Sequence, residues 1–467
     1  MRDPSPWCPR FAEGPGTLAD RLARAIAEDI GQGLLPRGTR LPAHRSLAAD
    51  LSTSVVTVGR AYTLLEQRGL ARGEHGRGTF VMGPGPGGGG GPWATPDTDS
   101  GTMANGLADL SLNLPPVLLN RQDFARAVAT LAETDALPDP ASYPPCAGST
   151  ELRRSASLWL TQQRPTAPAD GLLITNGALQ AVAIAFTLAA EPGRPVVTEA
   201  VTFPGAIVAA GNLGRPLLGA TMDEEGMVPD SLDAILTRHP GALVYVTPVL
   251  HNPTGATMSE ARRLAILAVA RKHQAQVVED DAYAILRGDR TPTLYHLDPD
   301  RVWYVNSFSK PLSALLRLGV LVAPRGREAE ATRGIQGSTW TAAPLPSAIL
   351  NLWLNDGTAD RTAIAMRADA TARMDLIRST FPGLVSPEYR AFHVWLPLPE
   401  PRAERICRWA LAEGISLTPP LAPVVDANLA MGLRLCLGAP SRPALARALA
   451  TLKGLLDREE HAAAAIL

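Results

Sequence analysis

A lysine is the residue with the clearest chemical potential in this chain. The 467 residues include three lysines, Lys272, Lys310 and Lys453, against 41 arginines, so arginine carries most of the positive charge. Arginine cannot form an imine, whereas the amine of lysine can condense with an aldehyde. A lysine kept in such a chain is therefore a candidate for covalent chemistry, and an ordinary surface lysine is the alternative.

The surroundings of Lys310 favour this chemistry at that position. Lys310 comes directly after Val-Trp-Tyr-Val-Asn-Ser-Phe-Ser, whose first part has the composition of a buried strand. Ser307 and Ser309 precede it, and Arg317 follows seven residues later. Hydroxyl groups and a guanidinium can hold a phosphate. An aldehyde cofactor that carries a phosphate group would therefore suit this segment.

A carboxylate and a phenol lie at the end of another apolar run. Asp280 closes the run Gln-Val-Val-Glu, and Tyr283 follows it. A carboxylate at a buried strand end needs a partner, and a protonated pyridine nitrogen would supply one while keeping a bound cofactor electron-poor. Tyr283 could then donate a hydrogen bond to a phenolic oxygen. An acidic loop or a helix cap is the alternative explanation for Asp280.

Further motifs could complete a site around these residues. Gly177 and Ala178 join a strand to a helix, where backbone amides bind phosphate. Asn252 lies in His-Asn-Pro-Thr-Gly directly after a strand, and Phe203 could stack on an aromatic ring. Arg434, between apolar neighbours, could pair with a carboxylate in a bidentate fork. Core packing for Phe203 and a structural salt bridge for Arg434 are the alternatives.

The segment that carries these residues alternates apolar runs with helical patterns. The apolar runs predict strands at 172–175, 195–199, 242–247, 276–280, 302–307 and 318–323. Helical patterns lie between several of them, notably at 178–190 and 260–274. This alternation predicts an α/β fold with a mostly parallel sheet. Ligands of such sheets gather beyond the carboxyl ends of the strands, which is where the candidate residues fall.

Composition divides the chain into two folding units. Residues 83–92 are glycine and proline, and the sequence stays polar to about residue 105, so no packed core is expected there. We predict a first domain at 1–82, a linker at 83–105 and a second domain at 106–467. The first domain has a net charge of +3 and the remainder −4, a mild asymmetry that fits a nucleic-acid partner.

The first domain is predicted to hold three helices and a hairpin. Apolar residues recur every four positions from 18 to 30, which indicates an amphipathic helix. A second short helix covers 47–51, and Ser54 is the expected N-cap of a third. Two short strands follow at 70–72 and 78–82. Three helices and a hairpin in so short a segment are the outline of a winged-helix domain.

Motifs in this domain resemble the DNA-binding domain of the GntR family. They are Leu-Pro-Ala-His-Arg-Ser-Leu-Ala at 41–48, the helix from 54, Leu-Glu-Gln-Arg-Gly-Leu at 65–70 and Gly-Arg-Gly-Thr-Phe-Val at 76–81. The resemblance implies that DNA is contacted by Arg45, Ser54, Val56, Thr57, His75 and Gly76. Val55 stands where the family often has arginine, so Arg60, one turn further on, is the candidate to replace that contact. A solvated polar face is the alternative for each residue taken alone.

From about residue 107 to 440 the second domain resembles the fold-type I aminotransferases, with a smaller C-terminal α+β subdomain. The resemblance implies that Lys310 forms a Schiff base with pyridoxal 5′-phosphate (PLP) and that Asp280 pairs with the pyridine nitrogen. Asn252 and Tyr283 would contact the phenolic oxygen, and Phe203 would stack on the ring. The phosphate would be bound by Gly177, Ala178, Ser307 and Arg317, and across a dimer interface by Tyr143. Arg434 would bind the carboxylate of an amino acid.

Two features near the lysine depart from the aminotransferase pattern. Pro311 follows Lys310 directly, and Ser-Ala-Leu-Leu at 313–316 replaces a more usual Ala-Pro-Gly-Leu. The lysine loop is therefore expected to be set differently, which bears on turnover rather than on cofactor binding.

A GntR-type head, a linker and an aminotransferase-like body together resemble the MocR subfamily of transcription regulators. This implies a homodimeric, PLP-dependent, cytoplasmic regulator that binds operator DNA and senses an amine, an amino acid or PLP. Two alternatives stay open. One is a working aminotransferase with an appended DNA-binding head, and the other is a body that keeps only a relic of the site and serves as a dimerisation module.

Composition argues against several other classes of protein. No apolar run reaches membrane-spanning length, and the N-terminus has no apolar core of the kind found in secretory signals. The four cysteines, Cys8, Cys146, Cys407 and Cys436, are scattered without metal-ligand spacing. We therefore expect no membrane partner, no metal site and a reduced, cytoplasmic chain.

Overall fold

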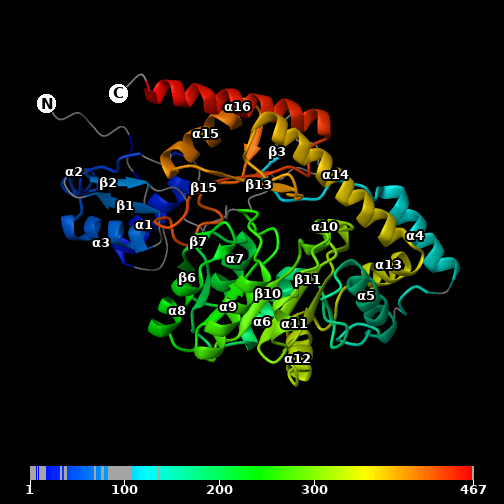
Figure 1. The fold of residues 1–467 in the computed structure, drawn as a ribbon. Coiled ribbons are helices and arrows are strands. Elements are labelled where there is room, and N and C mark those ends of the chain that lie inside the picture. Colours follow the sequence, from blue (N-terminus) through cyan, green and yellow to red (C-terminus); the bar gives the residue numbers. More distant parts are fainter. Residues whose placement is uncertain are drawn as a thin grey trace. The chain divides into compact units, whose positions relative to one another are not determined.

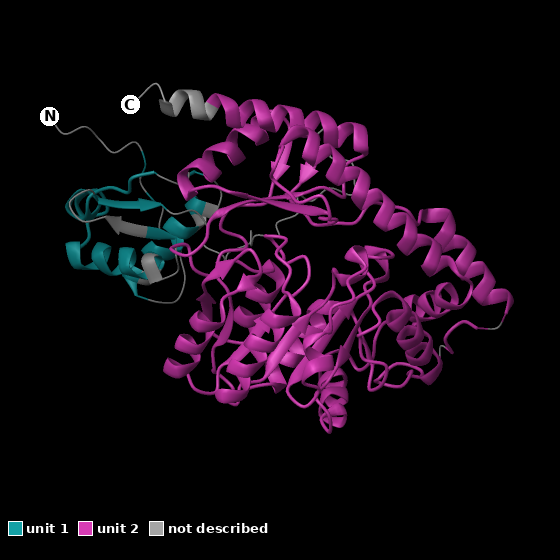
Figure 2. Cartoon of the chain, in the orientation of Figure 1, with its two compact units in different colours: residues 1–99 teal, residues 100–467 magenta. Residues whose placement is uncertain are grey.

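The computed structural model describes residues 7, 9, 17–31, 34–35, 39–67, 70–74, 78–81, 108–134, 136–139 and 141–464. The chain divides into two compact units, residues 1–99 and 100–467 (Figure 2). This division falls inside the segment predicted as the linker, 83–105, which lies outside the described residues.

The first unit is a three-helix domain with a two-stranded wing. Its elements are α1 (Leu18–Gly31), α2 (His44–Asp50), α3 (Val55–Gln67), β1 (Ala71–Glu74) and β2 (Gly78–Val81). Of the apolar side chains spaced by four residues on α1, Leu22, Ile26 and Ile30 share a buried core with Val58 and Leu65 of α3, whereas Leu18 is exposed. The strands β1 and β2 pair antiparallel. The winged-helix fold predicted from the sequence is confirmed.

The second unit is built on a seven-stranded sheet of strand order β4-β12-β11-β10-β9-β5-β6. Along this order the strands are Leu173–Thr175, Gly319–Val322, Val302–Ser307, Val277–Asp280, Leu243–Val246, Val196–Glu199 and Leu217–Ala220. The strands from β11 to β6 run parallel, whereas β12 is antiparallel to both of its neighbours. The predicted α/β fold with a mostly parallel sheet is confirmed.

Helices cover both faces of this sheet (Figure 1). One core cluster joins α6 (Ala178–Leu188), α7 (Pro204–Asn212) and α12 (Glu328–Thr339) to the sheet residues Val196, Leu243, Val278 and Trp303. A second cluster joins α8 (Pro229–Arg238) and α9 (Glu260–Lys272) to the adjacent residues Val197, Val244, Val277 and Val302. Successive side chains of a strand point to opposite faces, so burial on both faces requires the uninterrupted apolar runs seen in the sequence.

Two further layers complete this unit. The helices α4 (Arg121–Glu133), α5 (Thr150–Gln163) and α13 (Pro344–Asn355) pack together beside β4 and β12. A small subdomain pairs β13 (His393–Pro397) with β15 (Gly432–Cys436) and β14 (Ile415–Leu417) with β3 (Ala108–Leu110). The helices α14 (Thr358–Thr380), α15 (Glu400–Ala412) and α16 (Arg442–Ala464) cover it (Figure 1).

The remaining elements of the second unit are short connections. They are β7 (Met222–Asp223), β8 (Gly226–Met227), α10 (Ala284–Arg287), α11 (Leu294–Leu297) and a 3-10 turn at Ala314–Leu316. Within the described ranges, no helix is long and apolar enough to cross a membrane.

Candidate functional site

Lys310 lies beyond the carboxyl end of β11 and is partly buried. Its Nζ donates to the carbonyl oxygen of Asn113 and lies 5.6 Å from the centre of the Tyr283 ring. Burial lowers the pKa of the Lys310 amine to about 8, and the nearby Arg434 acts in the same direction. An amine with that pKa is deprotonated far more often near neutral pH than a surface lysine, as a nucleophile requires.

Asp280 lies at the carboxyl end of β10, the neighbour of β11, and is only 4% exposed. The Tyr245 hydroxyl donates to its Oδ2 at 2.8 Å, and the Ala282 amide donates to Oδ1 at 3.2 Å. Burial raises the pKa of the Asp280 carboxyl to about 6, and the hydrogen bond from Tyr245 opposes that rise. The structure thus holds a buried carboxylate that is ready for a cationic partner.

Tyr283 is the meeting point of two side-chain amides. Asn252 Nδ2 lies 3.2 Å and Asn113 Nδ2 lies 3.0 Å from the Tyr283 hydroxyl. Arg434 Nη1 donates to Asn252 Oδ1 at 3.0 Å, so the Asn252 amide joins Arg434 to Tyr283. Burial raises the pKa of Tyr283 far above its ordinary value, which keeps the phenol protonated and able to donate.

Arg434 is a buried guanidinium held by uncharged groups. Besides Asn252, it donates to Thr418 Oγ1 at 3.3 Å and to the Ser111 carbonyl at 3.3 Å. No carboxylate within the described part of the chain forms a salt bridge with it. The structural salt bridge considered from the sequence is therefore not found, and a buried cation without a counter-ion favours an anionic ligand.

The predicted phosphate-binding residues surround the start of α6. Gly177 caps this helix with φ +82°, a backbone conformation that favours glycine. Gly319 of β12 approaches it so closely that a Cβ atom there would lie 2.8 Å from the Ala178 nitrogen. The Ser309 amide donates to Ser307 Oγ at 3.1 Å. The amides at the start of α6 and a nearby hydroxyl thus form a setting that suits a phosphate.

The other predicted contacts differ in their exposure. Arg317 is exposed and has φ +52°. Phe203 is partly buried and caps α7. Tyr143 is 81% exposed, with its ring 5.8 Å from the ring of Trp340. The predicted role of Tyr143 across a dimer interface stays a prediction.

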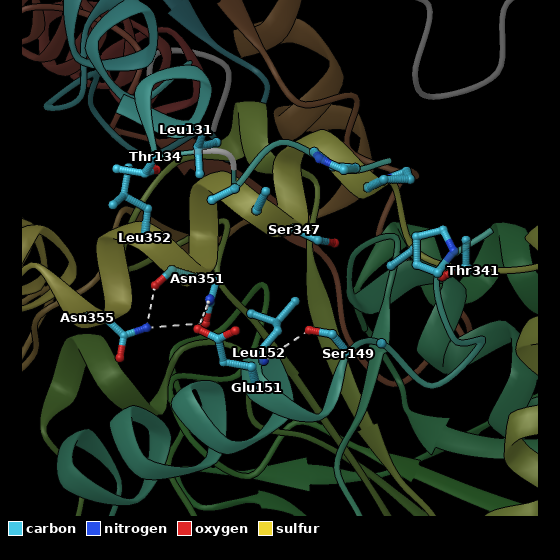
Figure 3. Close-up of a pocket in the computed structure, with 17 residues that line it drawn as sticks. Leu131, Thr134, Ser149, Glu151, Leu152, Thr341, Ser347, Asn351, Leu352 and Asn355 are labelled. Carbon is cyan, nitrogen blue, oxygen red and sulfur yellow. Dashed lines mark hydrogen bonds between the residues drawn. The ribbon is translucent and has the colours of Figure 1, made fainter. Parts of the chain in front are cut away.

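A cavity of about 470 Å³ lies between α4, α5 and α13 (Figure 3). Its wall combines apolar groups such as Leu131 and Leu352 with a polar edge, where Asn351 Nδ2 donates to Glu151 Oε1 at 2.9 Å. It shares no lining residue with the predicted site. The groups around Lys310 therefore remain the better candidate for function.

In the head, the candidate DNA contacts lie on α2 and α3. Ser54 Oγ accepts from the Thr57 amide at 3.0 Å, so Ser54 caps α3 as predicted. Arg45 and Arg60 are exposed, and Val56 is 72% exposed. An exposed valine on a helix that enters the major groove can contact a thymine methyl group. His75 and Gly76 lie outside the described residues.

Several neighbours of Lys310, Asp280 and Arg434 were missed by sequence reasoning. They are Asn113, Tyr245, His393, Thr418 and Cys436, whose Sγ lies 3.4 Å from the Ser111 carbonyl oxygen. Tyr245 carries a weak signal, because it stands in the strand predicted at 242–247. Asn113 and His393 carry none, since nothing in their local sequence marks them.

Comparison with known proteins agrees with this fold. Residues 106–452 match the class I and II aminotransferases, and residues 18–81 match the gntR family of bacterial regulatory proteins. The chain therefore belongs to the class I and II aminotransferase family. With its gntR-type head it has the MocR architecture, as its sequence predicted.

Its relatives include regulators and enzymes. It is 28% identical over 324 residues to the uncharacterized HTH-type transcriptional regulator YdfD of Bacillus subtilis, covering 65% of this chain and 67% of that protein. It is 30% identical over 331 residues to the vitamin B6 salvage pathway transcriptional repressor PtsJ of Salmonella typhimurium, covering 70% and 73%. The structure of LysN, the alpha-aminoadipate aminotransferase of Thermus thermophilus in complex with N-(5′-phosphopyridoxyl)-L-leucine, matches with a TM-score of 0.66 and 27% identity, over 76% of this chain and 92% of that one.

Proposed function

We propose that this chain is a PLP-dependent transcription regulator, whose head binds operator DNA and whose body binds PLP and responds to an amine or amino acid. The observation that carries the proposal is the pairing of two groups in one site. Asp280 is the last residue of β10, and Lys310 follows the carboxyl end of the adjacent parallel strand β11, in a chain that also has a winged-helix domain. A DNA-binding role agrees with the cytoplasmic location expected from the sequence.

The residues present fit PLP. Asp280 is buried and has a carboxyl pKa of about 6, so a protonated ring nitrogen would relieve the cost of its buried charge. Lys310 supplies an amine of lowered pKa, and the start of α6 supplies amides for a phosphate. When bound, PLP supplies an aldehyde that condenses reversibly with amines and a ring that withdraws electrons.

The residues of the site would each bind a different part of PLP. Lys310 would leave the Asn113 carbonyl and use its free amine. Tyr283 and Asn252 would hold the phenolic oxygen, and Phe203 would cover the ring. The phosphate would be held by Gly177, Ala178, Ser307, Ser309 and Arg317, with Tyr143 reaching the partner subunit of a homodimer.

Arg434 points to the class of effector. Its guanidinium is 3% exposed and keeps donors beyond those bound to Thr418, Asn252 and Ser111. A carboxylate is the anion that matches the remaining donors best. An amino acid, which offers both an amine for the cofactor and a carboxylate for Arg434, therefore suits the site better than a simple amine.

Sensing requires that the effector favours one of two states of the protein. The test is binding of the full chain to DNA from upstream of its own gene, followed by fluorescence anisotropy with and without PLP and a panel of amino acids. We expect an absorbance band of bound PLP that disappears in Lys310→Ala, and an operator affinity that changes with PLP and one amino acid. Operator binding indifferent to PLP and to every amine would refute sensing.

An active aminotransferase remains the second candidate, because Lys310, Asp280 and Arg434 are all compatible with turnover. An amino acid and a keto acid mixed with the PLP-loaded chain separate the two functions. Many rapid cycles of the cofactor absorbance would establish an enzyme. A single slow change of the absorbance, together with an altered operator affinity, would establish a sensor.

A further inference from the structure

His393 lies at the contact between the small subdomain and the large sheet. It opens β13, is fully buried, and its ring centre lies 5.1 Å from that of Tyr283. Its Nε2 lies 3.1 Å from the carbonyl oxygen of His251, and its Nδ1 lies 3.1 Å from Asn113 Nδ2. Both ring nitrogens therefore have a polar partner, Nε2 in the segment after β9 and Nδ1 in the segment after β3.

The partners of His393 determine where its proton lies. Burial lowers the pKa of its imidazole to about 3, so the ring is neutral at physiological pH. A carbonyl oxygen can only accept a hydrogen bond, so Nε2 must carry the hydrogen that faces His251. Because a neutral imidazole carries one such hydrogen, Nδ1 is bare and must accept from Asn113.

This tautomer in turn fixes the orientation of the Asn113 amide. Its Nδ2 must face His393, and the same group then donates to the Tyr283 hydroxyl at 3.0 Å. The cost is visible, since Asn113 Oδ1 is buried without a hydrogen-bond partner. Turning the amide over would give that oxygen the Tyr283 hydroxyl as a donor, but it would set two acceptors against each other, either Asn113 Oδ1 and His393 Nδ1 or His393 Nε2 and the His251 carbonyl.

Asn252 approaches Tyr283 with the same polarity. An arginine can only donate, so Asn252 Oδ1 faces Arg434 Nη1 and Asn252 Nδ2 faces Tyr283. The Tyr283 oxygen therefore receives two hydrogen bonds, and its own proton is left to donate elsewhere. That is the proton the proposed function requires at the phenolic oxygen of the cofactor.

We propose that His393 is a positioning residue that orients the Asn113 amide and thereby keeps the hydroxyl proton of Tyr283 directed at the cofactor. The inference rests on the proposed function for the identity of that cofactor. A buried histidine that only fills space would not need a defined tautomer, and this difference can be measured.

The first test is a pH titration of the absorbance of bound PLP in the full chain. The phenolate oxygen of bound PLP can accept a hydrogen bond from Tyr283 or from the protonated nitrogen beside it. Without the hydrogen bond from Tyr283, that nitrogen should hold its proton more tightly, so the pH midpoint of the absorbance change should rise. We expect a rise of roughly one pH unit in Tyr283→Phe and a rise in the same direction in His393→Leu. His393→Asn, whose Oδ1 can replace Nδ1 as acceptor, should stay closer to the wild type.

The double variant H393L/Y283F decides whether the two residues act together. If His393 acts through Tyr283, the double variant should titrate like Y283F alone. Shifts that add, or an unchanged midpoint in H393L, would overturn the proposal.

A second measurement does not depend on PLP. In the PLP-free chain with 15N-labelled histidine, the resonances missing in H393N belong to His393, and they should show the Nε2–H tautomer from pH 8 down to pH 5. A protonated ring or an Nδ1–H tautomer would refute the inference. A wild-type chain without any PLP band would instead refute the proposed function, while the tautomer still tests the role of His393.

Discussion

The Tyr245 hydroxyl lies 2.8 Å from Asp280 Oδ2 across two neighbouring parallel strands, in which Tyr245 is paired with Val278. Both side chains are buried. The phenol stabilises the ionised carboxylate with a hydrogen bond, yet burial still dominates and the carboxyl pKa stays at about 6. The protein therefore maintains a charge that destabilises its own PLP-free form, which is expected where a ligand compensates for that charge.

Asp280→Asn should stabilise the PLP-free chain at pH 7. The folded carboxyl has a pKa of about 6 instead of the ordinary 3.8, so the folded state binds the proton more tightly than the unfolded state. Stability is then lost as pH rises from about 4 through 6, by about 2 to 3 kcal/mol. Urea unfolding of both proteins at pH 4 and pH 7 checks this, and the advantage of the variant should vanish at pH 4. PLP should bind the variant more weakly, and a variant less stable than wild type at pH 7 would contradict the argument.

The rate at which Lys310 reacts with PLP should follow the deprotonation of its amine. Because only the free amine reacts, the rate of appearance of the PLP band should rise about tenfold per pH unit below pH 8 and level off above it. The matched control is K272R/K453R, which removes the other two lysines, both exposed, and should keep the same profile. A rate that continues to rise to pH 10 would indicate an unperturbed amine.

Gly319→Ala should weaken PLP binding by crowding the start of α6. The new Cβ atom would lie 2.8 Å from the Ala178 nitrogen, closer than carbon and nitrogen can approach without a shift of the backbone. The control is Gly337→Ala on α12, where a Cβ atom meets nothing within 4 Å and helix propensity favours alanine by about 1 kcal/mol. Fluorescence titration measures the PLP affinity of both variants. Equal affinities would show that the backbone at the start of α6 tolerates the added Cβ atom.

Arg45→Ala and Arg60→Ala should weaken operator binding. Both side chains are exposed on the helices proposed to face DNA. Loss of a phosphate contact should reduce the slope of log affinity against log salt by about one, whereas loss of a base contact should reduce specificity and leave the slope unchanged. Arg408→Ala on α15 of the body, also exposed, is the control. If all three variants bind alike, DNA is contacted by other residues.

The sequence is informative wherever a local pattern has a single physical cause. Successive residues of a strand, such as Val277 and Val278, face opposite layers of helices. Because both faces are buried, the strand is a continuous apolar run that is visible in the sequence. Lys310, Asp280 and Tyr283 could be found in the same way, because each follows such a run. The antiparallel insertion of β12 between β4 and β11 could not be predicted, since strand order depends on contacts between distant segments.

The partners of the site residues follow the same rule. Asn113 reaches Lys310 across 197 positions of the chain and His393 across 280. No local period or motif indicates such a contact, because the contact forms only when the small subdomain packs against the large sheet in the folded chain. The sequence therefore identified the reactive groups, whereas the groups that orient them required the fold.

The position of β3 has a consequence for signalling. The described part of the body begins at Ala108, β3 pairs there with β14, and Ser111 and Asn113 follow at once to contact Arg434 and Lys310. Under the proposed function, PLP would free the Asn113 carbonyl when it takes Lys310, and the carboxylate of an effector would compete with the Ser111 carbonyl for Arg434. Both changes would therefore act on the short segment directly after β3, among the first described residues of the second unit.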